Sequence, residues 1–155
     1  MSRYNIGVIS DTHGLIREEA LDVLKGSDLI IHAGDVGNAE VIEELKKLAP
    51  VYCVRGNCDK GELRDMLPEN QVVEIGEVFI YVVHNVDDLN LDPEAAGISI
   101  VITGHSHKPC ISAKGKVLYL NPGSAGPRRF NLPIAIARLT IEDENIEGNI
   151  IELSI

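Results

Sequence analysis

The first 54 residues alternate short apolar runs with amphipathic segments, and this alternation constrains the fold more than any other feature. Two segments, 16–26 and 38–49, place their apolar side chains on one helical face, and Asn38 is a good N-cap for the second. Around them lie three runs rich in β-branched residues, at 4–10, 28–32 and 51–54. This β-α-β-α-β order predicts parallel strands joined by right-handed crossovers.

The second half of the chain is richer in strands. Apolar runs flank the short turns GE and KG, which predicts two hairpins, and two long strands follow near the end of the chain. A further strand is predicted at 98–103, after a short helical piece in DPEAAG at 92–97. No linker separates the two halves. We therefore expect one domain over residues 1–155, with two stacked mixed sheets and helices outside them.

Composition and charge exclude several classes of protein. The 45% of hydrophobic and 25% of charged residues are typical of a globular protein. No run approaches the roughly 20 apolar residues of a membrane helix, and the first residues lack a signal-peptide pattern, so we expect a cytoplasmic protein without membrane contact. The net charge of −10 disfavours duplex nucleic acid. A small anionic substrate is compatible if bound cations supply positive charge, and homo-oligomerisation is left open.

Five of the predicted strands are each followed by a polar cluster. The clusters contain all five histidines of the chain, and they read SDTHG, HAGD, GNCD, the histidine before NVDD, and GHSH. The carboxyl ends of strands line the ligand crevice of open α/β sheets, so these clusters should converge in space. Residues two apart, such as Asp11 and His13, point the same way in an extended chain and can bind the same ion.

The donor types in these clusters indicate transition metals. The cysteines Cys53, Cys58 and Cys110 form no C-x-x-C pair, so we expect imidazole and oxygen ligands rather than thiolates. Such a donor set favours Mn, Fe, Co, Ni or Zn over Mg. Single Asp or Asn residues after strands are also ordinary turn chemistry. The candidate ligands are too many for one ion and fit two: Asp11, His13, Asp35, Asn57, His84, His105 and His107.

Taken in order, these blocks resemble those of the calcineurin-like metallophosphoesterases, which read D-x-H, G-D, G-N-(H/C)-D/E, a strand-ending H, and G-H-x-H. The resemblance covers residues 4–131 and looks strongest to the small single-domain prokaryotic phosphodiesterases, with blocks like TGHSHKP and NPGS at 121–124. It implies an α/β fold, a four-layer α/β/β/α sandwich of two mixed β-sheets flanked by helices.

The resemblance also assigns the ligands to two ions. One ion would be bound by Asp11, His13 and His107. The other would be bound by Asn57, His84 and His105. Asp35 would bridge both ions. Manganese is the favoured metal, with Ni, Co, Fe, Zn or Mg as alternatives. His32 has no ligand role in the family pattern, and we expect a packed histidine that orients the Asp35 loop.

The implied activity is metal-dependent hydrolysis of a small phosphoester, most simply a phosphodiester, by in-line attack of a hydroxide that bridges two divalent ions. The residues predicted to be catalytic are Asp35, Asn57, Cys58 and Asp59. Relatives that read G-N-H-D/E carry, at the position of Cys58, a histidine that interacts with phosphate or protonates the leaving group. A thiol is a different acid, which favours activated aryl diesters over alkyl phosphomonoesters. A small filler residue is the competing interpretation of Cys58.

A second departure from the family pattern follows His84. Asn85 and Val86 stand where the family usually has glycine, and the acidic Asp87 and Asp88 come next, so the loop beside the substrate is altered. Candidates for pairing with a substrate phosphate are Arg55, Arg128 and Arg129.

Two other functions compete with this interpretation. A subunit of the eukaryotic retromer coat resembles the family and uses the fold to bind partners, so a non-catalytic or weakly catalytic interaction scaffold is the main alternative. The complete ligand set favours an enzyme. A cyclic-nucleotide phosphodiesterase would share the chemistry, but its relatives typically carry the histidine that Cys58 replaces.

Overall fold

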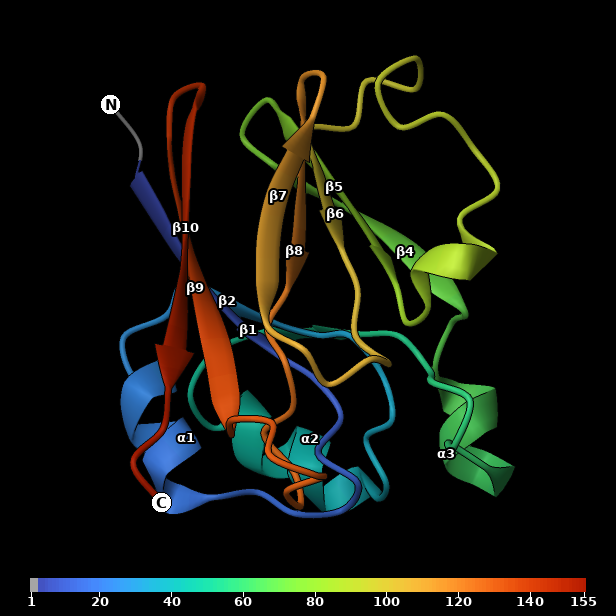
Figure 1. The fold of residues 1–155 in the computed structure, drawn as a ribbon, viewed down its shortest axis with the longest axis vertical. Helices are drawn as coiled ribbons and strands as arrows, with labels where there is room; N and C mark the ends of the chain where they lie inside the picture. The colour runs from blue at the N-terminus through green and yellow to red at the C-terminus, as the bar shows by residue number, and fades with distance from the viewer. Residues whose placement is uncertain (1–2) are drawn as a thin grey trace.

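The computed structural model describes residues 3–155 and contains two five-stranded β-sheets (Figure 1). The strands of the first sheet are Arg3–Ile9 (β1), Leu29–His32 (β2), Val51–Cys53 (β3), Ala135–Glu142 (β9) and Asn145–Glu152 (β10). Those of the second are Asn70–Ile75 (β4), Val78–Val83 (β5), Ile100–Ile102 (β6), Cys110–Lys114 (β7) and Val117–Asn121 (β8). The helices are Glu18–Leu24 (α1), Ala39–Lys46 (α2) and Gly61–Met66 (α3), with a 3₁₀ turn at Val86–Asp88 (η1). None of the helices within residues 3–155 is long and apolar enough to span a membrane.

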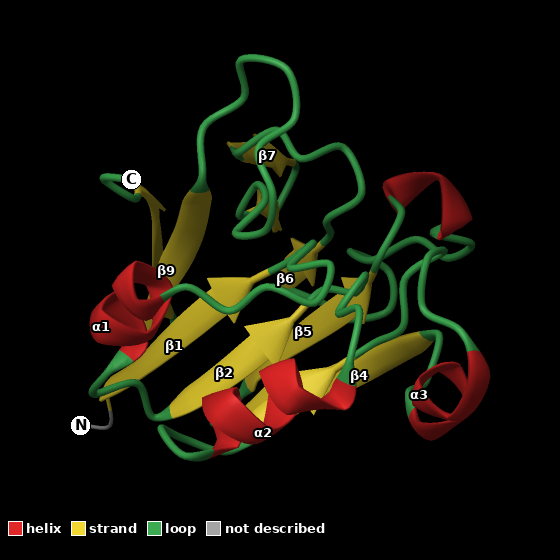
Figure 2. Ribbon diagram, turned by 90° about the horizontal axis from the view of Figure 1, so that it is seen from below, coloured by secondary structure: helices red, strands yellow, loops and turns green. Residues whose placement is uncertain are grey.

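Both sheets are mixed, which confirms the predicted α/β sandwich. Their orders are β10-β9-β1-β2-β3 and β4-β5-β6-β8-β7. In the first sheet β1, β2 and β3 are parallel, and in the second β5, β6 and β8 are parallel, while the outer pairings are antiparallel. The carboxyl ends of both parallel groups open toward the same end of the sandwich. The loops that follow them therefore meet there (Figure 2).

Two apolar cores hold this arrangement. The first lies between the sheets, where Ile6 of β1 and Ile80 of β5 are both completely buried. The second lies under α1 and α2, whose Leu24 and Leu45 pack against the outer face of the first sheet. Burying each such side chain contributes about 1.5–3 kcal/mol. The cores therefore provide the stability that allows polar loops to be held in demanding conformations at the sheet ends.

The outer face of the second sheet is covered by the segment 85–98, which contains η1 and no α-helix. Leu89 and Leu91 of this segment pack against Tyr81 and Val101 of the sheet. The fourth layer of the predicted sandwich is therefore present, but it is thin. It places a loop, rather than a rigid helix, immediately after the histidine that ends β5.

The helices differ from the sequence predictions in two places. Asn38 caps α2 as predicted, because its side-chain oxygen accepts the N–H of Val41 at 3.3 Å. The helical piece predicted at 92–97 is wrong: these residues form successive turns that end at Gly97, with φ of +80°, and so short a segment cannot propagate a helix. The sequence pattern does not predict helix α3. None of the side chains of this helix is fully buried, so it shows no periodic apolar face.

His32, at the end of β2, is buried and joins two loops. Its Nδ1 accepts the N–H of Gly34 at 3.1 Å, which leaves the ring proton on Nε2, 3.0 Å from the hydroxyl oxygen of Thr12. Thr12 in turn donates to the carbonyl of Val36 at 2.8 Å. Burial lowers the pKa of His32 to about 4. The histidine is thus a neutral support for the loops after β1 and β2, in agreement with the packed role expected for it.

Replacing His32 with Asn should flatten the pH dependence of stability. The unfolded imidazole binds a proton near pH 6.5 and the folded one near pH 4, so the unfolded state gains stability as pH falls through this window. Over this window the titration of His32 should lower the free energy of unfolding of the wild type by up to ~3 kcal/mol. Asn keeps an acceptor for Gly34 and does not titrate. Urea unfolding of both chains with chelator, from about pH 7 to about pH 4.5, checks this. A difference between the chains that does not vary with pH would contradict it.

Candidate metal centre

All the predicted metal ligands lie in one cluster where the two sheets meet. Asp11 and His13 follow β1, Asp35 follows β2 and Asn57 follows β3. His84 follows β5, and His105 and His107 follow β6. Each sheet therefore supplies one side of the cluster. The convergence predicted from the carboxyl ends of the strands is present in the structure.

Most of these residues have an unusual backbone. The φ angles of Asp11, His13, Asp35, His105 and His107 lie between 46° and 71°. Non-glycine residues adopt this left-handed region rarely, at a cost of about 1–3 kcal/mol each, and such residues are typical of functional sites. Within residues 3–155 only two other non-glycine residues have positive φ, both in turns outside the cluster. The fold thus accepts strain mainly where the predicted ligands lie.

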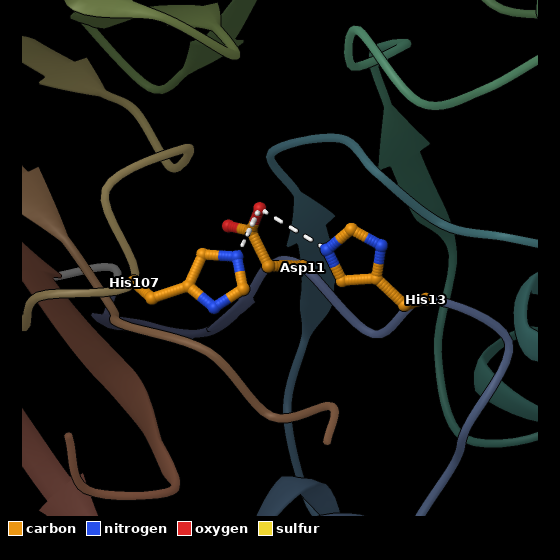
Figure 3. Close-up of side chains that lie close together, drawn as sticks. All are labelled: Asp11, His13 and His107. Atoms are coloured by element: carbon orange, nitrogen blue, oxygen red, sulfur yellow. Dashed lines mark ion pairs between the residues drawn. The ribbon is translucent and has the colours of Figure 1, made fainter. Parts of the chain in front are cut away.

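Asp11 lies between two imidazoles, as Figure 3 shows. Its Oδ1 is 3.9 Å from Nε2 of His13 and 3.3 Å from Nε2 of His107. Its Oδ2 accepts the hydroxyl of Ser10 at 2.6 Å and the N–H of His105 at 3.1 Å. The carboxylate is therefore fixed through one oxygen, while the other faces the two rings.

Asp35 links imidazoles that belong to the two different predicted ions. Its Oδ2 is 3.1 Å from Nε2 of His84 and 3.8 Å from Nε2 of His13. Its Oδ1 accepts the N–H of Cys58 at 2.8 Å. Burial alone would raise the pKa of Asp35, but the interactions with His84 and Cys58 outweigh it and lower the pKa to about 2. Asp35 is therefore a carboxylate throughout the neutral range.

The hydrogen bonds of His84 fix which nitrogen faces the cluster. Its Nδ1 lies 2.7 Å from the carbonyl of Ala33, and because a carbonyl only accepts, Nδ1 carries a proton. Burial lowers the pKa of His84, but the Asp35 carboxylate and the charge of Asp11 raise it more, so the net shift is upward. A histidine fixed by a backbone carbonyl on its far nitrogen is typical of metal ligands.

Asn57 and His105 lie on the exposed side of the cluster. The side-chain oxygen of Asn57 is 3.2 Å from Nδ1 of His105. The ring of His105 stands edge-on to that of His84, with 5.3 Å between centroids. These three residues, which the resemblance assigns to one ion, are therefore neighbours. Both side chains are exposed, so this side of the cluster is open to solvent.

The cluster fits divalent cations. Three groups have ligand atoms within 4.8 Å of one another: Asp11, His13 and His107; Asp11, Asp35 and His84; His13, Asp35 and Cys58. Within residues 3–155, Asp11 Oδ1 and His13 Nε2 are buried without a hydrogen-bond partner. Such atoms are costly unless something binds them, and their donor types match transition metals. The thiol of Cys58 also belongs to this donor set, whereas the sequence predicts only imidazole and oxygen ligands.

Asp59 is a buried support rather than a residue at the surface of the cluster. Its side chain accepts the N–H of Gly37 at 3.0 Å and that of Gly56 at 2.9 Å, one on each oxygen. These bonds join the loops after β2 and β3, and a Cβ on Gly56 would overlap the carboxylate of Asp35. The structure therefore supports a positioning role for Asp59, the residue predicted to be catalytic next to Cys58. Partial burial and the charge of Asp35 raise the pKa of the Cys58 thiol.

The segment 121–124, which begins with the last residue of β8, also supports the cluster. Asn121 donates to the carbonyl of Gly104 at 2.9 Å and to the hydroxyl of Ser106 at 3.1 Å. The hydroxyl of Ser124 donates to the carbonyl of Asp11 at 3.0 Å. The NPGS block thus holds the loops that carry Asp11 and His105. The family resemblance was the only signal in the sequence that pointed to it.

The sequence of this chain is similar to those of known proteins. The family model of the calcineurin-like phosphoesterase superfamily domain matches residues 4–144. A probable metallophosphoesterase of Methanocaldococcus jannaschii is 36% identical over 96% of this chain and 81% of its own length. The phosphodiesterase YfcE of Escherichia coli K12 is 31% identical over 84% of each chain.

A solved structure extends the comparison of folds. The structure of vacuolar protein sorting 29 from Cryptosporidium parvum superposes with a TM-score of 0.77 over 99% of both chains, at 22% identity. This likeness shows a common fold. The family match and the sequence identity to the archaeal relative show more: the chain belongs to the calcineurin-like phosphoesterase superfamily, among relatives that are small prokaryotic metallophosphoesterases and phosphodiesterases.

Proposed function

We propose that this chain is a metal-dependent phosphodiesterase that hydrolyses a small phosphodiester with two divalent ions. The position of Asp35 carries the proposal, because one ionised carboxylate lies between His13 and His84, which belong to the two predicted ligand sets. The name of the Escherichia coli relative, a phosphodiesterase, supports the reaction type. The net charge of −10 supports a small substrate over duplex nucleic acid. We also propose that the enzyme acts in the cytoplasm.

The predicted ligands have different roles in the proposed reaction. Divalent cations held here would act as Lewis acids and would activate water for in-line attack at phosphorus near neutral pH. Asp11, His13 and His107 would hold one ion, and Asn57, His84 and His105 the other. Asp35 would keep the two ions together. Nitrogen and oxygen donors favour manganese, and the nearby thiol of Cys58 extends the range toward Zn, Co and Ni.

The exposed residues act on the substrate side in this proposal. Asn57 and His105 lie where a phosphate can approach from solvent. Cys58 is also exposed, and its N–H is bonded to Asp35. Its side chain follows Asn57 directly in the sequence and could contact a phosphate or a leaving oxygen. Asp59 and His32 accept backbone N–H groups and thereby hold the loops after β2 and β3.

An interaction scaffold is the competing proposal. The solved structure of vacuolar protein sorting 29 shares the fold, but at 22% identity the likeness says nothing about function. An interaction scaffold does not need buried ligand atoms that face one another. In this chain Asp11 Oδ1 and His13 Nε2 are buried, and within the described residues they have no hydrogen-bond partner. The ligand geometry therefore favours an enzyme.

Asp35→Asn should reduce activity more than His13→Ala does. Losing this carboxylate weakens the holding of both ions, whereas losing His13 affects one, so we expect a loss of kcat/KM at least about tenfold larger. The assay is hydrolysis of bis(p-nitrophenyl) phosphate by metal-stripped chains reloaded with Mn²⁺. Asp22→Asn, an exposed carboxylate on α1, is the matched control and should retain full activity. Equal, mild losses in the two site variants would identify Asp35 as a turn residue only.

Cys58→His should help poor leaving groups more than good ones. General acid catalysis contributes about 10²–10⁴-fold, but Asp59 is already bonded to two backbone N–H groups and is not free to orient a new imidazole, so about tenfold is expected. A p-nitrophenolate needs little protonation and should gain least. The dependence of kcat/KM on leaving-group pKa, with equal metal content and Cys58→Ala as control, measures this. An unchanged slope would show that position 58 does not serve the leaving group.

A further inference from the structure

A cleft of about 310 Å³ adjoins the metal centre. Two predicted ligands, Asn57 and His84, form part of its lining, and two arginines, Arg55 and Arg64, form another part. The chain carries an overall charge of −10, so two guanidinium groups beside the predicted ligands are a local exception to its charge. The cleft continues the metal centre toward the part of the molecule where α3 and η1 lie.

The two arginines have different partners. Arg55 donates to the carbonyl of Leu67 at 3.3 Å and lies 3.8 Å from the carboxylate of Glu69, so its own chain already engages it. Arg64 is exposed in the last turn of α3, and within residues 3–155 its side chain has no ion pair and no hydrogen bond. The free guanidinium of the cleft is therefore that of Arg64.

Two carboxylates also line the cleft, and they limit what it can bind. Glu69 is the partner of Arg55. Asp88 belongs to the 3₁₀ turn after His84, the acidic loop in which this chain departs from its family. An anion in the cleft would be attracted by Arg64 and repelled by Asp88. The two residues should therefore have opposite effects on the same ligand.

We propose that this cleft binds a second anionic group of the substrate, carried on one of the two organic groups of the phosphodiester, through Arg64. The inference rests on the proposed function, because the metal centre would hold the reacting phosphate. A guanidinium matches the oxygens of carboxylates and phosphates. A volume of about 310 Å³ lies at the lower end of small-molecule sites, which fits one aryl or sugar-sized group.

The test compares the affinity of two product-like monoesters for the Mn²⁺-loaded protein by calorimetry at fixed ionic strength. Phenyl phosphate lacks the second anion, and 4-carboxyphenyl phosphate carries it. We expect the carboxylated monoester to bind about fivefold more tightly, as one partly exposed ion pair allows. Arg64→Gln should remove this preference, and Asp88→Asn should increase it. Lys116→Gln, which removes an exposed cation at the β7–β8 turn, should leave the preference unchanged.

Hydrolysis of bis(p-nitrophenyl) phosphate, measured in parallel, separates the two proposals. The wild type could prefer the carboxylated monoester and lose this preference in Arg64→Gln, yet hydrolyse no diester. That result would overturn the proposed activity and support anion binding in the cleft. Hydrolysis with equal affinities for the two monoesters in the wild type would overturn the cleft alone. Absence of binding by both monoesters, or an equal loss of both affinities in Arg64→Gln, would also overturn it.

Discussion

The carboxylate of Asp35 holds together parts of the site that come from both sheets. One oxygen accepts the N–H of Cys58, in the loop after β3, and the other faces His84, at the end of β5 in the second sheet. His13, after β1, lies on the same side. The contact joins three loops through one ionised group. Together with the bond from the N–H of His105 to Asp11, this contact sets the distance between the two predicted ligand sets.

This contact depends on a rigid frame that is outside the cluster. The two apolar cores fix the strands, and several residues just after the strand ends then hold left-handed backbone conformations that a looser structure would relax. Polar side chains outside the predicted ligand set complete the frame. His32 and Asp59 bind backbone N–H groups of the first sheet's loops, and Asn121 and Ser124 connect the end of β8 to the loops of both sheets.

Much of this arrangement could be predicted from the sequence, because two strong signals agree. Alternating apolar runs identify the strands, and every histidine of the chain lies in a polar cluster at or just after the end of a strand. Features that depend on side-chain partners could not be predicted. The bonds of Asp59 to Gly37 and Gly56 join positions that only the folded loops bring together. Helix α3 has no fully buried side chain to give a periodic signal, so the cleft that contains Arg64 could not be anticipated either.

The most direct test of the account is the number of ions that the chain binds. Protein stripped with chelator, saturated with Mn²⁺ and freed of excess ion should contain close to two ions per chain by elemental analysis. The cluster offers donor groups on both sides of Asp35, and a shared carboxylate should let both sides fill. A content that stays at one ion or none under saturating Mn²⁺, Zn²⁺ or Co²⁺ would contradict the account.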